Sequence, residues 1–223
     1  ALAFEQIIAQ AHPLASTAIE VIEGGRKVAG SATFQAGLVE LQDVASQAVV
    51  ETLALRKGQR ILDYCAGGGG KALALAALAD SAVDAWDSDA ARMQDIAKRA
   101  ERAGADITCL TEKPSGQYDI VLCDVPCSGS GAWRRAPQGK WLLTSERLTQ
   151  LGNVQGDILQ QAARLVSPGG VLVYTTCSLL AQENMDQLAK FTEATPGWIC
   201  DFSRQFLPIE GGDGFFVGHL RSV

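Results

Sequence analysis

The sequence predicts an α/β fold of the Rossmann-like type, in which helices cover both faces of a mainly parallel sheet. From about residue 36, short apolar runs of strand length alternate with segments of helical apolar spacing. One apolar run ends in four consecutive glycines and opens a helix, the turn with which such folds approach a ligand. Because helices that join successive strands make right-handed crossovers, the strands would lie parallel, with their carboxyl ends at one edge.

The first 35 residues are expected to form a separate appendage that carries no chemistry. Residues 4–11 (FEQIIAQA) favour a short helix that ends before a proline. Residues 17–30 (TAIEVIEGGRKVAG) favour a hairpin, with two strands around Gly24 and Gly25.

The main domain then follows in regular order. Residues 38–55 show helical spacing and end in two cations and a glycine, a typical helix end. Five strands are then predicted at residues 60–65, 82–87, 106–110, 118–124 and 169–177, four helices at 71–79, 89–104, 145–166 and 181–195, and a final pair of strands around 198–203 and 214–222.

The composition is that of a globular chain that can bury a core without disulfides. It has 223 residues, of which 47% are hydrophobic and 20% charged. Six cysteines spread from Cys65 to Cys200 favour reduced thiols, and with no C-x-x-C pair and only two histidines no metal site is expected. The apolar stretches are shorter than the roughly 20 residues of a membrane span. With no signal peptide visible, we expect a cytoplasmic protein without a membrane partner.

The glycine run indicates a nucleoside site. In ILDYCAGGGGKA the chain can turn sharply and approach a ligand closely. Asp87 follows Gly67 by 20 residues, at the end of the next strand, where an acid accepts hydrogen bonds from ribose hydroxyls. A phosphate-binding P-loop would need a glycine at position 66 and a hydroxyl residue at 72, and both are alanine. A dinucleotide site and a merely loose turn stay open as alternatives.

Two cysteines stand just past the ends of two strands. Cys127 lies in DVPCSGSG, after Asp124 and Pro126, and Cys177 lies in YTTCS, before a helix whose amino end can lower a thiol pKa. Taken alone, Cys127 fits a small buried hydrophobe better. Because both thiols would reach one edge of the sheet, together they favour a thiol nucleophile with a second thiol beside it.

Charge argues against broad nucleic-acid binding, since the net charge is −6 and the pI about 5.0. Any RNA contact would be local. The one basic cluster, in GAWRRAPQGKW, interleaves Arg134, Arg135 and Lys140 with Trp133 and Trp141, which suits phosphate contacts and base stacking. A solvated loop with one buried tryptophan is an equal alternative.

In the right order, these motifs resemble those of the RsmB/Nop2/Sun family of RNA cytosine-5 methyltransferases, in particular bacterial rRNA methyltransferases. LQDVASQAVV resembles the family's QDxAS helix, DYCAGGGGK its D-x-C-A-x-P-G-G-K loop, DVPCSGSG and TTCS its paired PC and TC motifs, and DGFFVGHLR its closing strand. The resemblance runs from about Gly37 to the carboxyl terminus. It implies a class I methyltransferase domain with a seven-stranded sheet at residues 36–223, preceded at 1–35 by the remnant of a small RNA-binding-type subdomain.

The resemblance also implies a chemistry: S-adenosylmethionine as cofactor, and RNA as substrate, with rRNA preferred over tRNA. Cys177 would add to C6 of cytosine and so activate C5 for methylation, and Cys127 would assist release of the product. Asp124 would sit between cofactor and base and hydrogen-bond the cytosine edge, and Lys71 is counted among the catalytic residues. The implied cofactor-binding residues are Cys65, Ala66, Gly67, Gly68, Gly69, Gly70, Lys71, Asp87, Arg92 and Asp124.

Three departures from the family pattern leave alternatives open. Gly68 replaces a proline, Ala72 replaces a hydroxyl residue, and Glu112 is the only candidate for the acidic residue expected after the third strand. A weakened or inactive methyltransferase that serves as an RNA-binding or assembly factor is therefore an alternative, as is a methyltransferase for another nucleic acid. The target RNA and an upstream RNA-binding domain are left open, and a monomer is expected because no long exposed apolar stripe is visible.

Overall fold

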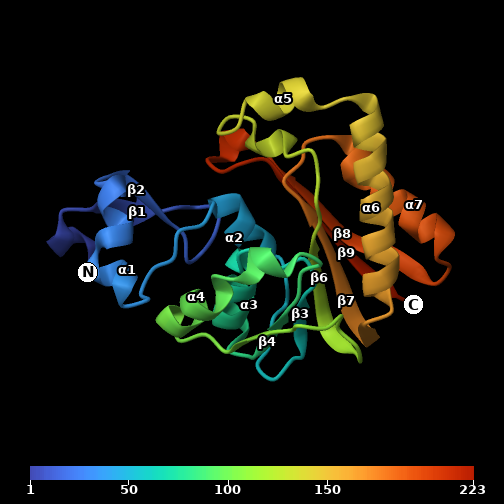
Figure 1. The fold of residues 1–223 in the computed structure, drawn as a ribbon, viewed down its shortest axis with the longest axis horizontal. Coiled ribbons are helices and arrows are strands. Elements are labelled where there is room, and N and C mark those ends of the chain that lie inside the picture. The colour runs from blue at the N-terminus through green and yellow to red at the C-terminus, as the bar shows by residue number, and fades with distance from the viewer.

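The computed structural model describes all of residues 1–223 and contains two separate sheets (Figure 1). The main sheet has seven strands in the order β5-β4-β3-β6-β7-β9-β8, and β9 alone runs antiparallel to its neighbours. This confirms the predicted α/β fold with a mainly parallel, seven-stranded sheet. The second sheet is the antiparallel pair β1 (Ile8–Ala11) and β2 (Ile19–Glu23), near the amino terminus.

The elements of the main domain follow the predicted alternation. Its strands are β3 (Ile61–Asp63), β4 (Val83–Ala85), β5 (Ile107–Cys109), β6 (Tyr118–Asp124), β7 (Val166–Thr176), β8 (Trp198–Phe206) and β9 (Phe215–Ser222). Its helices are α2 (Val44–Glu51), α3 (Gly70–Ala79), α4 (Ile96–Ala103), α5 (Gln138–Leu142), α6 (Ser145–Ala163) and α7 (Met185–Ala194), with the short α1 (Ala32–Gln35) before them. No helix is both long enough and apolar enough to span a bilayer.

The sheet is buried on both faces, which explains why its central strands are almost continuously apolar. On β6, Ile120 and Leu122 pack into the core beneath α2 and α3, while Val121 and Cys123 pack into a second core beneath α6 and α7. Figure 1 shows α3 and α4 on one side of the sheet and α6 and α7 on the other.

The strand order reverses between β3 and β6, and this reversal positions the site. The chain moves outward from β3 to β4 and β5 and then returns to place β6 on the other side of β3. Open α/β sheets bind ligands at such a point, outside the carboxyl ends of the strands. The loops after β3, β4, β6 and β7 all reach this edge.

The amino-terminal prediction was wrong in detail. Residues 4–11 do not form a helix: a 3-10 helix (Leu2–Glu5) ends at Gln6, whose φ of 56° is left-handed, and β1 follows. The hairpin joins β1 to β2, so Gly25–Gly30 is a 3-10 helix and not a second strand. Ile7 is buried but Ile8 is exposed, so a helix here would have no apolar stripe to bury, and strand pairing satisfies the backbone instead. The domain boundary at residue 35 stays a prediction.

Two predicted helices are shorter or divided, and a local cap explains the first. The helix expected at 38–55 begins only at Val44, because the Asp43 carboxylate accepts a hydrogen bond from the Ala45 amide (2.9 Å) and caps α2. The segment 89–104 divides into a 3-10 helix (Ala90–Met93) and α4. The short α5 was not predicted.

Candidate active site

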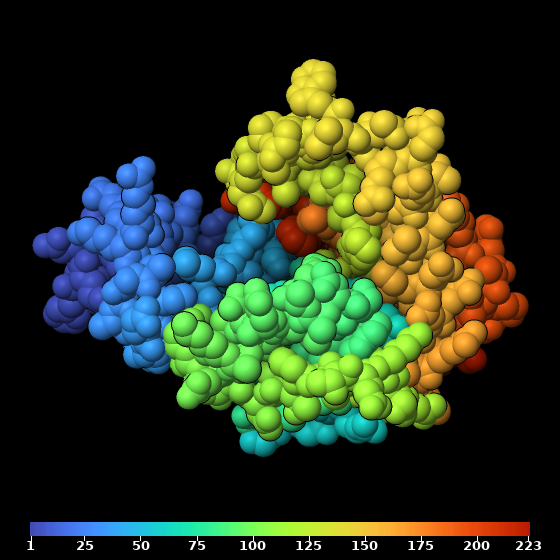
Figure 2. Space-filling model, in the orientation of Figure 1, coloured from blue at the N-terminus to red at the C-terminus, as the bar shows by residue number.

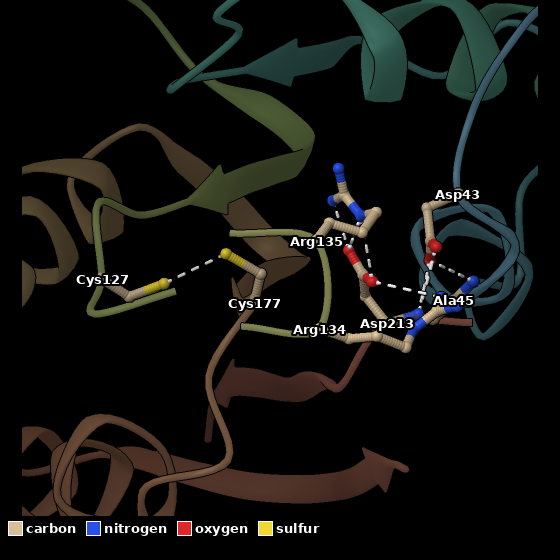
Figure 3. Close-up of polar contacts among 7 residues, drawn as sticks. All are labelled: Asp43, Ala45, Cys127, Arg134, Arg135, Cys177 and Asp213. Atoms are coloured by element: carbon tan, nitrogen blue, oxygen red, sulfur yellow. Dashed lines mark hydrogen bonds and ion pairs between the residues drawn. The ribbon is translucent and has the colours of Figure 1, made fainter. Parts of the chain in front are cut away.

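The two cysteine loops lie side by side because their strands are neighbours. β6 and β7 pair in parallel, with Asp124 opposite Thr175 at their carboxyl ends. Cys127 and Cys177 follow, and their Sγ atoms lie 3.4 Å apart, within the range of an S–H···S hydrogen bond (Figure 3). Both side chains are partly exposed, so a substrate could reach them.

This contact shifts the pKa values of the two thiols in opposite directions. The hydrogen bond with Cys177, and then burial, raise the pKa of Cys127 far above its usual range. The same hydrogen bond lowers the pKa of Cys177, and the charge of Lys71 lowers it further, against burial and the charge of Asp124. Burial raises the pKa of each of the remaining cysteines: Cys65, Cys109, Cys123 and Cys200. Cys177 is therefore the one cysteine of the six whose pKa is lowered, and a hydrogen bond from Cys127 stabilises its thiolate form.

Lys71 and Asp124 form an ion pair beside the sulfurs. The Lys71 ammonium, on the first turn of α3, lies 2.6 Å from the Asp124 carboxylate at the end of β6. Its side chain is only 6% exposed, against 34% for Asp124, and it also lies over the ring of Phe215, 4.7 Å from the centroid. Asp124 thus stays partly open to solvent while Lys71 holds it in place.

The glycine loop wraps around Asp87. The Gly67 amide donates to an Asp87 carboxylate oxygen (2.9 Å), and the Arg92 guanidinium lies 3.1 Å from the same oxygen. Gly67 and Gly69 both have positive φ, and a Cβ on Gly69 would lie 2.8 Å from the side chain of Ile96. Glycine is therefore required at these two positions both by backbone conformation and by the close packing of the loop.

The remaining predicted cofactor residues continue this loop. The Ala66 amide donates to the Trp86 carbonyl (3.0 Å), which ties the loop to the end of β4. Cys65 precedes it, and Gly68 and Gly70 complete the turn into α3. All predicted site residues thus lie around one edge of the sheet. Glu112 does not join them, because it is exposed and makes no hydrogen bond or ion pair.

The floor of the site is rich in carboxylates. Asp63, at the end of β3, is 1% exposed, and neither of its carboxylate oxygens has a hydrogen-bond partner. Burial, and then the charge of Asp124, raise the pKa of Asp63 to about 7, against the opposing charge of Lys71. Three carboxylates, on Asp63, Asp87 and Asp124, thus lie near two cations, Lys71 and Arg92. Because Lys71 and Arg92 are both paired with carboxylates, the site offers no unpaired cation of this set to a diphosphate, which argues against the P-loop and dinucleotide alternatives.

Asp63→Asn should make the protein more stable at alkaline pH. The pKa is 3.8 in the unfolded chain and about 7 in the folded one, so the stability that this group contributes is lost as pH rises between these values. The variant lacks this loss, and its advantage in unfolding free energy should grow by about 1 to 3 kcal/mol between pH 5 and pH 8. Urea unfolding measures it, with the exposed Asp157→Asn as control; an advantage that stays constant with pH would contradict the assignment.

A second network closes the opposite side of the site, and the sequence analysis missed its centre, Asp213. The Arg135 guanidinium makes a bidentate contact with the buried Asp213 carboxylate, with Nε at 2.9 and 3.1 Å, and Arg134 lies 3.8 Å away. The Asp213 amide donates to the Asp43 carboxylate (3.0 Å), which caps α2 through Ala45 (Figure 3). Three segments far apart in the sequence are thereby joined.

These segments border a hollow. Figure 2 shows it between the yellow and yellow-green residues around α5 and the green residues of α3 and α4, with orange and red atoms from the carboxyl-terminal part of the chain at its floor. The two tryptophans of the basic cluster differ: Trp133 is partly buried, and Trp141 is 82% exposed. RNA binding by this segment stays a prediction.

Comparisons with known proteins agree with this geometry. A model of the 16S rRNA methyltransferase RsmB/F family matches residues 50–221. The chain is 36% identical over 198 residues to ribosomal RNA small subunit methyltransferase B of Proteus mirabilis, with 84% of this chain and 47% of that protein covered. It is 38% identical over 208 residues to the protein of the same name from Xylella fastidiosa, with 84% and 49% covered. The chain thus spans about half the length of these relatives.

Solved structures have the same fold. The crystal structure of PH0851 superposes with a TM-score of 0.91 at 26% identity, over 99% of this chain and 55% of that one. NSun6 from Pyrococcus horikoshii, solved with SFG, superposes at 0.79 and 22% identity, over 92% of this chain and 59% of that one. The family match covers every predicted site residue, from Cys65 to Cys177. The chain belongs to the RsmB/F family of 16S rRNA methyltransferases.

Proposed function

We propose that this chain methylates C5 of a cytosine in RNA, with small-subunit rRNA as the first substrate to test, through a covalent bond between Cys177 and C6 of the base. The observation that carries the proposal is the sulfur pair, 3.4 Å apart, in which one thiol has a lowered pKa and the other a raised one. Family membership supports an RNA substrate, and the paired thiols support the cytosine-5 position.

The cofactor that fits the site is S-adenosylmethionine. Its ammonium and sulfonium groups are positive, which suits a floor made of Asp63, Asp87 and Asp124. Asp87 would accept hydrogen bonds from the ribose, and the loop from Cys65 to Lys71 would enclose the remainder. When bound, S-adenosylmethionine supplies the methyl group that C5 of the base receives.

The residues of the chain would perform the steps on the base. The Cys177 thiolate forms a bond to C6, and the displaced electron pair makes C5 nucleophilic. The Asp124 carboxyl, held by Lys71, hydrogen-bonds the edge of the base and orients it. If the target cytosine is in a helix, it has to be flipped out of the stack to reach the sulfurs.

Release of the methylated base from Cys177 depends on the second thiol, Cys127. Once the Cys177 sulfur is bonded to carbon, it no longer carries the charge and hydrogen bond that raise the pKa of Cys127. Cys127 can then give its proton to solvent water, and its thiolate accepts the proton at C5; the electron pair of that C–H bond re-forms the double bond between C5 and C6, and Cys177 leaves as a thiolate. The order of the two steps thus follows from the contact between the two sulfurs.

The test is a methyl-transfer assay with labelled S-adenosylmethionine and an unmodified transcript of small-subunit rRNA, followed by bisulfite sequencing. The proposal predicts label in the RNA and protection of a cytosine from deamination. Label at a base other than cytosine would contradict it. No binding of S-adenosylmethionine at millimolar ligand by calorimetry would favour the alternative of an RNA-binding or assembly factor.

The exposed part of the basic cluster should bind RNA. Lys140 and Trp141 lie on α5, and their side chains make no hydrogen bond or ion pair with the rest of the chain. Lys140→Ala should lower the slope of log affinity against log salt by about one, and Trp141→Ala should weaken binding by about 1 to 3 kcal/mol without changing that slope. Fluorescence anisotropy with a labelled rRNA fragment measures both. Lys190→Ala, on α7, is the control, and equal behaviour of all three variants would contradict the assignment.

A further inference from the structure

A buried carboxylate lies beneath both cysteine loops. Glu183 ends a 3-10 helix (Ala181–Glu183) after β7, is 0% exposed and makes no ion pair. Its side chain accepts four hydrogen bonds: from the Ser128 amide (2.8 Å), from the hydroxyls of Ser128 and Ser178 (2.6 Å for Ser178), and from the Gln155 amide group (3.1 Å). Glu183 is not among the predicted site residues and has no role in the proposed steps.

The donors come from the two loops that carry the sulfurs. Ser128 directly follows Cys127, and Ser178 directly follows Cys177. Gln155, on α6 and also fully buried, donates in addition to the Pro126 carbonyl (3.0 Å), just before Cys127. One carboxylate therefore binds the residue next to each sulfur, and its neutral partner binds the other end of the Cys127 loop.

Packing alone does not account for this arrangement. Burial of a charged group without a cation costs free energy, which hydrogen bonds offset only when the group is well surrounded by donors. An apolar side chain of similar volume would fill the space without that cost. What a carboxylate adds is a set of directional contacts, and here three of the four come from the serines that directly follow Cys127 and Cys177.

We propose that Glu183 is a positioning residue that holds the two cysteine loops together and so sets the distance between the sulfurs of Cys127 and Cys177. The negative charge of Glu183 also contributes to the raised pKa of Cys127, and so favours the protonated form of that thiol. The effect on catalysis rests on the proposed function, whereas the effect on the sulfurs does not.

The sulfur distance can be tested without RNA or cofactor. In glutathione redox buffers, the fraction of protein with a Cys127–Cys177 disulfide, trapped by acid and identified by peptide mass, measures the effective concentration of one thiol at the other. Glu183→Ala should lower this effective concentration at least tenfold. Glu183→Gln should stay within about threefold of the unchanged protein, because its amide still reaches the serine hydroxyls, which can accept as well as donate. Glu193→Ala, exposed on α7, is the control.

A second readout concerns the reaction. Glu183→Ala should lower kcat for methyl transfer at least tenfold and leave KM for the rRNA transcript within about twofold, because the loops bind the reacting base but contribute little to overall RNA affinity. Glu183→Gln should recover most of kcat. The inference would be overturned if Glu183→Ala and Glu183→Gln lowered kcat by the same factor and both left the effective concentration of the two thiols unchanged.

Folding and function are kept separate in this design. If Glu183→Ala does not fold, Ser128→Ala and Ser178→Ala each remove donors from one loop and should each lower the effective concentration at least threefold. An unchanged value in both would overturn the inference, as would a Glu183→Ala protein that is less stable but has an unchanged effective concentration. If the unchanged protein transfers no methyl group and the redox result is as expected, the proposed function fails and the role of Glu183 stands.

Discussion

Replacement of Cys177 by alanine should abolish methyl transfer, with a fall in rate of about four orders of magnitude or more. Of the six thiols, only this one has a lowered pKa, and without a thiolate at C6 the C5 position of cytosine is not activated. Labelled S-adenosylmethionine and the rRNA transcript measure the rate. Binding of the cofactor should be nearly unchanged, because Cys177 lies outside the glycine loop.

The matched control is Cys200→Ala. That thiol is on β8, donates to the Phe202 carbonyl and touches no residue of the site. It should leave the rate within about twofold of that of the unchanged protein, the range expected for a change away from the site. Activity in a Cys177→Ala protein above about one hundredth of the normal rate would overturn the assignment of the nucleophile.

Replacement of Cys127 by alanine should have the opposite signature: a stable covalent complex with RNA. The variant keeps the nucleophile but loses the group that accepts the C5 proton, so the Cys177–C6 bond forms and is not released. Turnover should fall by about two to four orders of magnitude. Denaturing gel electrophoresis should show a slower band that disappears after treatment with ribonuclease.

The double variant Cys127→Ala, Cys177→Ala is the control for this complex and should form none.

The rate at which the single variant Cys127→Ala forms the complex should also depend on pH in a defined direction. Without the Cys127 donor, the hydrogen bond that lowers the pKa of Cys177 is lost, so that pKa rises and less thiolate is present at neutral pH. Complex formation should therefore be faster near pH 9 than near pH 7.

Much of the fold could be predicted from the sequence because its signals are local. The runs of β6 and β7 are apolar on both faces, and the glycines of the β3–α3 turn have positive φ or close neighbours. The edge where the two cysteines meet follows from right-handed crossovers alone. By contrast, β1 and β2 are short and mostly exposed, and their apolar residues carry no clear period.

The parts of the site that were missed depend on tertiary structure. The raised pKa of Asp63 comes from burial and from Asp124, which is 61 residues away in the sequence. Glu183 lies 55 residues from Ser128, and Asp213 lies 78 residues from Arg135. No periodicity or spacing reports such contacts. Asp63 and Asp213 do stand inside motifs that the sequence analysis quoted, so position within a motif was the only available signal.

The measurement that tests the central claim most directly is peptide mass analysis of the complex trapped by Cys127→Ala. Cleavage after arginine and lysine separates the segments of residues 127 and 177, since Arg134, Lys140 and Arg164 lie between them. After ribonuclease digestion, the peptide with Cys177 should carry a cytidine nucleotide with one added methyl group. A nucleotide on any other cysteine, or a fully released product with no complex, would contradict the account.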